Sequence, residues 1–233
     1  MNYGYDRIAF QQRYDVEQIT EDSWHSYSGQ QTLSIVRKAL AERGPGRLLL
    51  NAGSGVHRLD LGGWQEISVD LFEQPLKERS MSVRANVEAL PFRSGVFEAV
   101  VCVGEVLGYC DPRKALAQFA RVSTSSGILV FDFQSTRSFR YWFTRGYARA
   151  ADLLEDEYNG SVEHLWAYDP VYLLRLAEDS GYKVKDIFGF HTVSAAARRF
   201  GASPEFGLKL ESCFGMRLCK RWADLITVVA ELA

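Results

Sequence analysis

The stretch Arg47-Leu-Leu-Leu-Asn-Ala-Gly-Ser-Gly55 decides the fold of this chain. Its three leucines form a short apolar run, which is typical of a parallel strand buried on both faces. Two glycines follow, Gly53 and Gly55, which let the backbone turn sharply and approach a ligand closely. Because ligands of open α/β sheets bind at the carboxyl ends of strands, the stretch predicts a ligand-binding turn after a central strand.

An acidic residue ends the next predicted strand. Asp70 closes Glu66-Ile-Ser-Val-Asp70, roughly 20 residues past the turn, where a nucleoside-binding βαβ unit has its ribose-binding carboxylate. Two carboxylate oxygens can accept from two ribose hydroxyls. The alternative for Asp70 is a helix cap or a solvated acid at the strand end.

Arg58 stands where a dinucleotide-binding turn has its third glycine. That glycine allows tight helix–strand packing, so its absence argues against NAD or FAD. A nicotinamide-dependent oxidoreductase is therefore disfavoured, and a nucleoside ligand without a phosphate is favoured.

Five segments, taken in order, resemble the motifs of class I S-adenosylmethionine-dependent methyltransferases of the small-molecule group. They are residues 48–55, Ile67–Asp70, Ala85–Phe92, Phe97–Tyr109 and Ala120–Phe131. The resemblance continues weakly through residues 181–184 and 225–230, which look like the last two strands. It implies one α/β domain over residues 1–233, with a Rossmann-like seven-stranded, mostly parallel sheet, helices on both faces and an antiparallel last strand.

The resemblance also implies S-adenosylmethionine as the cofactor. The glycine turn would hold its methionine part, Asp70 its ribose, and the segment around Asn86 its adenine. The residues implied for cofactor binding are Asn51, Ala52, Gly53, Ser54, Gly55, Asp70, Leu71, Asn86, Val87, Val103 and Gly104.

Two of these residues depart from the family pattern. Asn51 and Asn86 stand where the family usually has acids. Both changes keep hydrogen-bonding groups and remove negative charge. They leave open a non-catalytic member of the fold that acts as a binding or partner subunit.

The implied reaction is a one-step displacement at the sulfonium methyl group. A hydroxyl or amine acceptor would also need a base to remove its proton. Three residues are candidates for that base: Glu105 after the fourth strand, His164 after the aromatic stretch, and His191 after the sixth strand of the expected sheet.

Residues 134–167 form an insertion in the expected fold. Residues 137–149 alternate arginines with aromatic rings, and the acidic run Asp152–Glu157 follows. Three interpretations remain: a helix packed on the sheet edge, a lid over the acceptor, or a membrane or nucleic-acid surface. The third is disfavoured because the basic run is short and promptly neutralised. By resemblance, the N-terminal arm 1–28, with Tyr14 and Tyr27, would close over the same cleft.

Composition bounds the remaining properties. The 233 residues are 47% apolar and carry a net charge of −2, which suits a single α/β domain without a global basic field for nucleic acid. Four cysteines without metal-type spacing, no signal peptide and no long apolar run predict a cytoplasmic protein. We expect a small or medium organic acceptor, no metal, no nucleic acid and no stable membrane association; a homodimer is left open.

The sequence pattern predicts elements at defined positions. Helices are expected over residues 29–43, 112–122 and 170–181. Strands are expected near 47–51, 66–70, 81–85, 97–103, 127–133, 183–190 and 224–231.

Overall fold

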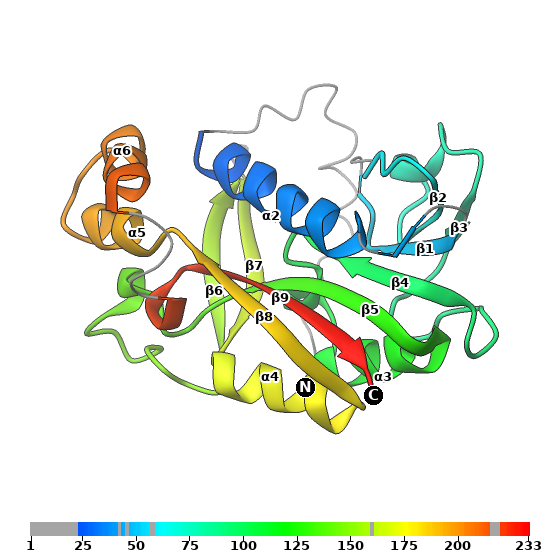
Figure 1. The fold of residues 1–233 in the computed structure, drawn as a ribbon. Helices are drawn as coiled ribbons and strands as arrows, with labels where there is room; N and C mark the ends of the chain where they lie inside the picture. Colours follow the sequence, from blue (N-terminus) through cyan, green and yellow to red (C-terminus); the bar gives the residue numbers. More distant parts are fainter. Residues whose placement is uncertain (1–22, 42, 45–46, 56–58, 159–160, 215–219) are drawn as a thin grey trace.

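The computed structural model describes residues 23–41, 43–44, 47–55, 59–158, 161–214 and 220–233. Seven of its strands form one sheet, in the order β3-β2-β1-β4-β5-β9-β8 (Figure 1). Their bounds are β1 (Arg47–Ala52), β2 (Trp64–Asp70), β3 (Ser82–Arg84), β4 (Phe97–Cys102), β5 (Ser123–Gln134), β8 (Tyr182–Phe190) and β9 (Leu225–Leu232).

The sheet is parallel except for β9, which runs antiparallel to both of its neighbours, β5 and β8. The predicted seven-stranded sheet with an antiparallel last strand is therefore confirmed. The chain leaves β1 towards β2 and β3, then returns to place β4 on the other side of β1. Such a switch point opens a crevice at the carboxyl ends of the strands.

One face of the sheet is covered by α2 (Ser23–Ala41). Its buried residues Val36 and Leu40 pack on Leu49, Val101 and Val130 from the central strands. The predicted start of this helix near residue 29 is wrong by about two turns, since Ser23–Ser28 are already helical. The arm upstream of residue 23, with Tyr14, lies outside the described residues.

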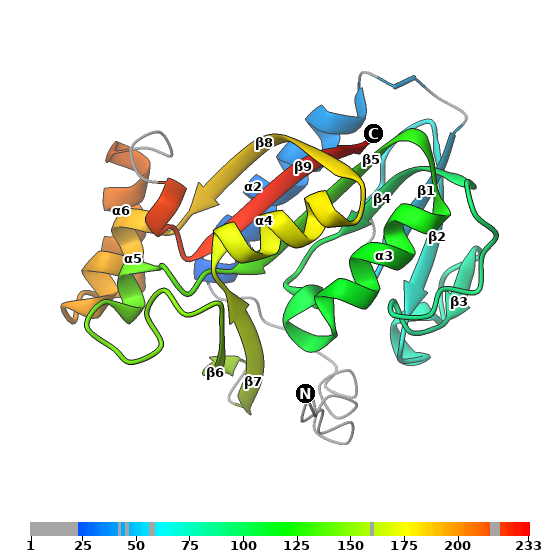
Figure 2. The same ribbon diagram turned by 90° about the horizontal axis from the view of Figure 1, so that it is seen from below.

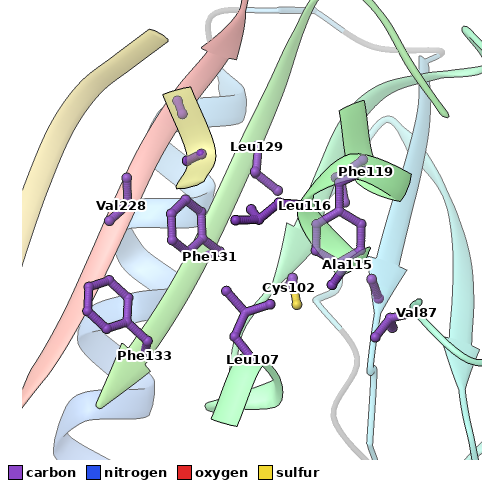
Figure 3. Packing of buried hydrophobic residues seen from close by; sticks show 14 of the residues in the cluster. Val87, Cys102, Leu107, Ala115, Leu116, Phe119, Leu129, Phe131, Phe133 and Val228 are labelled. Atoms are coloured by element: carbon purple, nitrogen blue, oxygen red, sulfur yellow. The ribbon is translucent and has the colours of Figure 1, made fainter. Parts of the chain in front are cut away.

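The opposite face is covered by α3 (Pro112–Val122) and α4 (Pro170–Asp179), which lie side by side across the sheet in Figure 2. Figure 3 shows Leu116 of α3 beside Leu129 and Phe131 of β5, with Phe119 farther across towards Val87. Both helices begin as predicted, with an Asp-Pro pair. Each aspartate accepts the backbone N–H two residues on, Asp111 from Arg113 at 3.0 Å and Asp169 from Val171 at 2.9 Å.

The insertion forms a separate two-stranded sheet, which the sequence did not predict. Its strands are β6 (Ala151–Tyr158) and β7 (Ser161–Tyr168), and the aromatic stretch before them contains only the short 3-10 turn η3 (Phe139–Tyr141). The helical interpretation of that stretch is therefore wrong. Leu154, Leu165 and Ala167 alternate towards one face of the hairpin, where Tyr109 and Tyr141 pack against them. Period-two burial favours a strand over a helix.

Two short helices extend one end of the sheet beyond β8. They are α5 (Thr192–Arg199) and α6 (Pro204–Phe214), and the 3-10 turn η4 (Lys220–Trp222) leads from them towards β9. The buried carboxylate of Glu211 on α6 accepts the backbone N–H groups of Thr192, Val193 and Ser194 at 2.7–3.0 Å. Because free N–H groups at a helix start attract an anion, this contact locks the two helices together.

Candidate functional site

The glycine turn after β1 is tied to the end of β2. The backbone N–H groups of Gly53 and Ser54 both donate to the carbonyl of Val69, at 2.8 and 2.9 Å. Gly53 has a φ of +72°, and a Cβ at this residue would lie 2.6 Å from both methyl carbons of Val106. Only glycine combines this backbone conformation with this close approach.

Asp70 joins the turn to the start of the next loop. Its carboxylate oxygens accept the N–H of Gly55 at 2.9 Å and the N–H of Phe72 at 3.0 Å. Burial raises the pKa of this carboxyl, while the backbone amides of Phe72, Gly55 and Leu71 and the nearby Arg79 partly oppose that rise. A carboxylate has about four acceptor positions. The backbone amides occupy part of this capacity, and the remainder is available to a ribose hydroxyl.

Arg79 is a part of this site that sequence reasoning missed. Its guanidinium donates to the carbonyl of Gly55 at 2.8 Å and to the hydroxyl of Ser68 at 2.5 Å. The side chain therefore braces the glycine turn against β2. Nothing in the polar run around Arg79 distinguishes it from a solvated surface residue, so the sequence held no usable signal.

The carboxylate that the first motif lacks is present on the neighbouring strand. The side-chain amide of Asn51 donates to Glu66 Oε1 at 2.8 Å. Glu66 also accepts from the hydroxyl of Ser68 at 3.1 Å and the N–H of Leu59 at 3.3 Å. The Asn51 amide is thus engaged inside the sheet, and an acid still organises the backbone beside the turn.

Two features of the turn and of the loop after β4 suit a bound ligand. The Ser54 hydroxyl is buried and has no hydrogen-bond partner in the part of the chain that the structure describes. Gly104 has a φ of +86°, and no atom lies within 4 Å of the position of a Cβ there. A polar atom that needs a partner and an open space beside a glycine fit the edge of a small polar molecule.

The other residues implied for cofactor binding lie along the same edge of the sheet. Asn86 is exposed and its side-chain oxygen accepts the N–H of Glu88 at 2.9 Å, while Val87 is buried in the core. The carbonyl of Leu71, after β2, accepts from Arg84 at 3.1 Å. Val103, after β4, packs against the cluster beneath α2.

Buried Asp132 on β5 holds the loop that follows β4, and sequence reasoning missed it as well. Its two oxygens accept the backbone N–H groups of Gly104 at 3.0 Å and Glu105 at 2.8 Å. Burial raises its pKa to about 6, although both amides favour the charged form.

Replacing Asp132 by asparagine should therefore change how stability depends on pH. The folded pKa, about 6, lies above the ordinary value of 3.8. Folded protein then binds the proton more tightly, so the stability present below pH 4 is lost as the pH rises to about 6. The unfolding free energy of wild type minus that of Asp132→Asn should fall by about 2 kcal/mol between pH 4 and pH 7.

Urea denaturation at both pH values measures this difference. The exposed Asp60 offers the matched control, because Asp60→Asn makes the same chemical change outside the protein interior. A difference for Asp132→Asn that stays constant with pH would contradict the role of burial.

Residues 48–131 match the sequence profile of a methyltransferase domain family. The chain is similar to methyltransferases over these residues, and its sheet has the Rossmann-like methyltransferase fold. No curated protein matches its sequence.

Solved structures share the fold of this chain at low sequence identity. An S-adenosylmethionine-dependent methyltransferase from Mesorhizobium loti has a TM-score of 0.58 and 15% identity, over 85% of this chain and 96% of that one. A geranyl diphosphate C-methyltransferase from Streptomyces coelicolor, in complex with Mg²⁺, geranyl diphosphate and S-adenosyl-L-homocysteine, has a TM-score of 0.59 and 16% identity, over 90% and 80%. The [4+2]-cyclase SpnF has a TM-score of 0.59 and 15% identity, over 93% and 84%.

The methyltransferase fold separates the three candidate bases. Glu105 follows β4 with a φ of +62°, and His191 follows β8 with a φ of +59°. Three strand spacings, about 14 Å, lie between β4 and β8 in the sheet. His191 is buried and stacks on Trp24 of α2 with a ring separation of 3.8 Å. His164 lies exposed on β7, 3.3 Å from Glu155 on β6.

Proposed function

We propose that this methyltransferase domain binds S-adenosylmethionine across the carboxyl ends of β1, β2 and β4 and methylates a small or medium organic acceptor. The observation that carries the proposal is the bond between Asp70 and Gly55, which joins the predicted ribose acid to the glycine turn at 2.9 Å. The coupled pair sits at the switch point of the sheet, where this fold class binds ligands.

Each part of the site would have a separate role. Gly53 and Gly55 would admit the cofactor to the backbone, Ser54 would offer its free hydroxyl, and Asp70 would accept from the ribose. Asn86 and Val87 would flank the adenine. When bound, the cofactor supplies an electrophilic methyl group on its sulfonium. The chain supplies alignment, exclusion of water and, for a hydroxyl or amine acceptor, a base.

The β6–β7 hairpin covers the carboxyl end of β4 and is the proposed lid over the acceptor. The hairpin packs on the 3-10 turn η2 (Val106–Tyr109), where a Cβ at Gly108 would lie 3.0 Å from the carbonyl oxygen of Trp166. Val106 in the same turn reaches Gly53, so η2 connects the hairpin to the cofactor turn. We therefore place the acceptor between the hairpin and the sheet edge.

Glu105 is the candidate base that adjoins the cofactor turn, since it directly precedes Val106. His164 lies on the hairpin and His191 lies farther along the sheet edge. Each would act only on an acceptor that extends towards it. We further propose a cytoplasmic location, which is consistent with the two buried free thiols of Cys102 and Cys110.

The alternative is a binding or partner subunit that does not transfer a methyl group. The observation that favours it is the loss of acids at Asn51 and Asn86. A related fold also serves a [4+2]-cyclase, so the fold alone does not specify methyl transfer.

Two measurements separate these functions. Calorimetry with S-adenosylhomocysteine should give binding in the micromolar range, whereas no binding would refute the cofactor proposal. Incubation with methyl-labelled cofactor and a panel of organic acceptors should then label an acceptor. Cofactor binding with no labelled product across the panel would favour the partner subunit.

The same assays test the lid through Tyr141, which packs against the hairpin. Tyr141→Ala should lower turnover at least tenfold and leave the affinity for S-adenosylhomocysteine within about twofold, because the ring is on the acceptor side. Tyr109→Phe is the control, since it keeps the ring of the other tyrosine in this cluster. Unchanged turnover in Tyr141→Ala with a lowered melting temperature would show that the ring is only part of the core.

A further inference from the structure

The end of the molecule formed by η3, α5, α6 and η4 exposes a group of aromatic rings. Figures 1 and 2 both show α5, α6 and the loop after β5 at this end. Four of the eight large apolar side chains that are exposed in the described part of the chain lie here: Trp142, Phe143, Phe200 and Phe206. Phe143 is 85% exposed and Phe200 is 81% exposed, so no groove encloses either ring.

Ring stacking joins the separate segments of this end. Phe139 of η3 stacks on Trp222 of η4 with a centroid distance of 5.4 Å, and its edge meets Trp142 at 5.1 Å. Trp142 in turn stacks on Phe143 at 5.1 Å. Two of the four exposed rings, Trp142 and Phe143, therefore pack on an aromatic base formed by Phe139 and Trp222.

The same segments carry a concentration of basic side chains. Six exposed ones have no ion-pair partner among the described residues: Arg145, Arg198, Arg199, Lys209, Lys220 and Arg221. Glu211 of α6 is buried, because its carboxylate contacts the start of α5. The exposed acid on α6 is therefore Glu205. Because the whole chain has a net charge of −2, this end is more basic than the chain as a whole.

The arginines of the insertion contribute little to this charge. Arg137 pairs with Asp169 at 2.6 Å, and Arg149 pairs with Asp152 at 3.2 Å. Five of the six basic side chains without an ion-pair partner lie at residues 198–221, and the fold brings them beside the aromatic loop. The short basic run of the insertion disfavoured a membrane surface, and the fold adds these distant basic side chains to it.

We propose that this basic aromatic end binds reversibly to an anionic lipid surface. Protruding phenylalanine and tryptophan side chains enter the boundary between headgroups and acyl chains, and surrounding lysines and arginines attract anionic headgroups. Phe206 and Lys209 stand three residues apart on α6, and Arg199 directly precedes Phe200. An aromatic side chain and a basic side chain are therefore neighbours in both pairs.

Charge complementarity favours this surface over two other occupants. A second copy of the chain would bring like charges together across a two-fold interface, which costs free energy. Single-stranded nucleic acid is bound in grooves that follow its backbone, whereas these rings protrude.

Vesicle sedimentation with the full chain tests the proposal. At 0.1 M NaCl the protein should bind vesicles of equal phosphatidylglycerol and phosphatidylcholine and should not bind phosphatidylcholine alone. Raising the salt to 0.5 M should weaken binding at least tenfold, because the attraction is screened. Arg199→Glu/Lys209→Glu should weaken it by about 25-fold or more, the loss expected from two basic side chains near such a surface. Phe143→Ser/Phe200→Ser should weaken it about tenfold by removing inserted rings.

Matched variants elsewhere on the surface control for total charge and apolarity. Lys77→Glu/Arg93→Glu makes the same charge change at exposed sites near the opposite edge of the sheet, and Val171→Ser removes an exposed apolar side chain on α4. Both should bind vesicles as wild type does. The proposal is overturned if wild type ignores anionic vesicles, if the controls lose as much binding as the test variants, or if single-stranded DNA competes the protein off the vesicles with higher affinity. It also fails if Phe143→Ser/Phe200→Ser only dissolves a dimer and leaves vesicle binding intact.

Discussion

Gly53→Val should abolish the binding of S-adenosylhomocysteine and lower the free energy of unfolding by about 2 to 6 kcal/mol. The stability loss has two sources: a positive φ at a β-branched residue costs about 1–3 kcal/mol, and overpacking costs about as much again. Both apply here, since φ is +72° and a Cβ would lie 2.6 Å from Val106. Calorimetry and urea denaturation measure the two effects. This stability loss is larger than the turn motif alone indicates, because the motif does not reveal Val106.

Two variants separate the loss of binding from the loss of stability. Gly95→Val carries a similar φ of +69° in open space, so it should lose some stability and bind the cofactor normally. Gly53→Ala/Val106→Ala removes the two methyl carbons that would lie at 2.6 Å, leaves the Cβ of residue 106 at 3.1 Å, and retains a side chain at the turn. This double variant should fold. Its affinity for S-adenosylhomocysteine should nevertheless be at least tenfold lower than that of Val106→Ala. Full affinity in this folded double variant would show that the turn is not the site.

Asp70→Ala should weaken the binding of S-adenosylhomocysteine by about 10- to 150-fold, which corresponds to about 1.5–3 kcal/mol for hydrogen bonds to a charged group. The variant should also be less stable, because the N–H groups of Gly55 and Phe72 lose the carboxylate that accepts them. Their bonds position the turn, so part of the lost affinity reflects a displaced turn.

Asp70→Asn is the matched variant for this experiment. It keeps an acceptor oxygen for one of the two amides and removes the charge, so it should recover much of the stability and less of the affinity. Equal dissociation constants for wild type and Asp70→Asn would restrict Asp70 to a structural role. An unchanged constant in Asp70→Ala would refute the ribose assignment altogether.

The seven-stranded sheet and the glycine turn after its first strand could be predicted because their signals are local. Leu48–Leu50 form a continuous apolar run, Asp111-Pro112 and Asp169-Pro170 are helix starts, and Gly53 and Gly55 follow a strand directly. Each of these signals depends on the backbone preferences and burial of adjacent residues, so it is legible without knowledge of distant contacts. The placement of Asp70 beside the turn follows from the same logic, since parallel neighbouring strands end at one edge.

The remaining features depend on contacts between residues far apart in the chain, which a single sequence does not encode in any local pattern. Arg79 reaches Gly55 across 24 positions, and Asp132 holds the amides of Gly104 and Glu105 across 28 and 27. The hairpin in the insertion was hidden because its aromatic and charged residues suit a helix as well as a strand. The basic aromatic end arises only when α5 and α6 fold against η3. The sequence by itself determined the strands of the main sheet, the starts of α3 and α4, and the glycine turn, because local chemistry specifies them. The tertiary structure decided what braces that turn and which distant charges share a surface, because packing sums interactions over the whole chain.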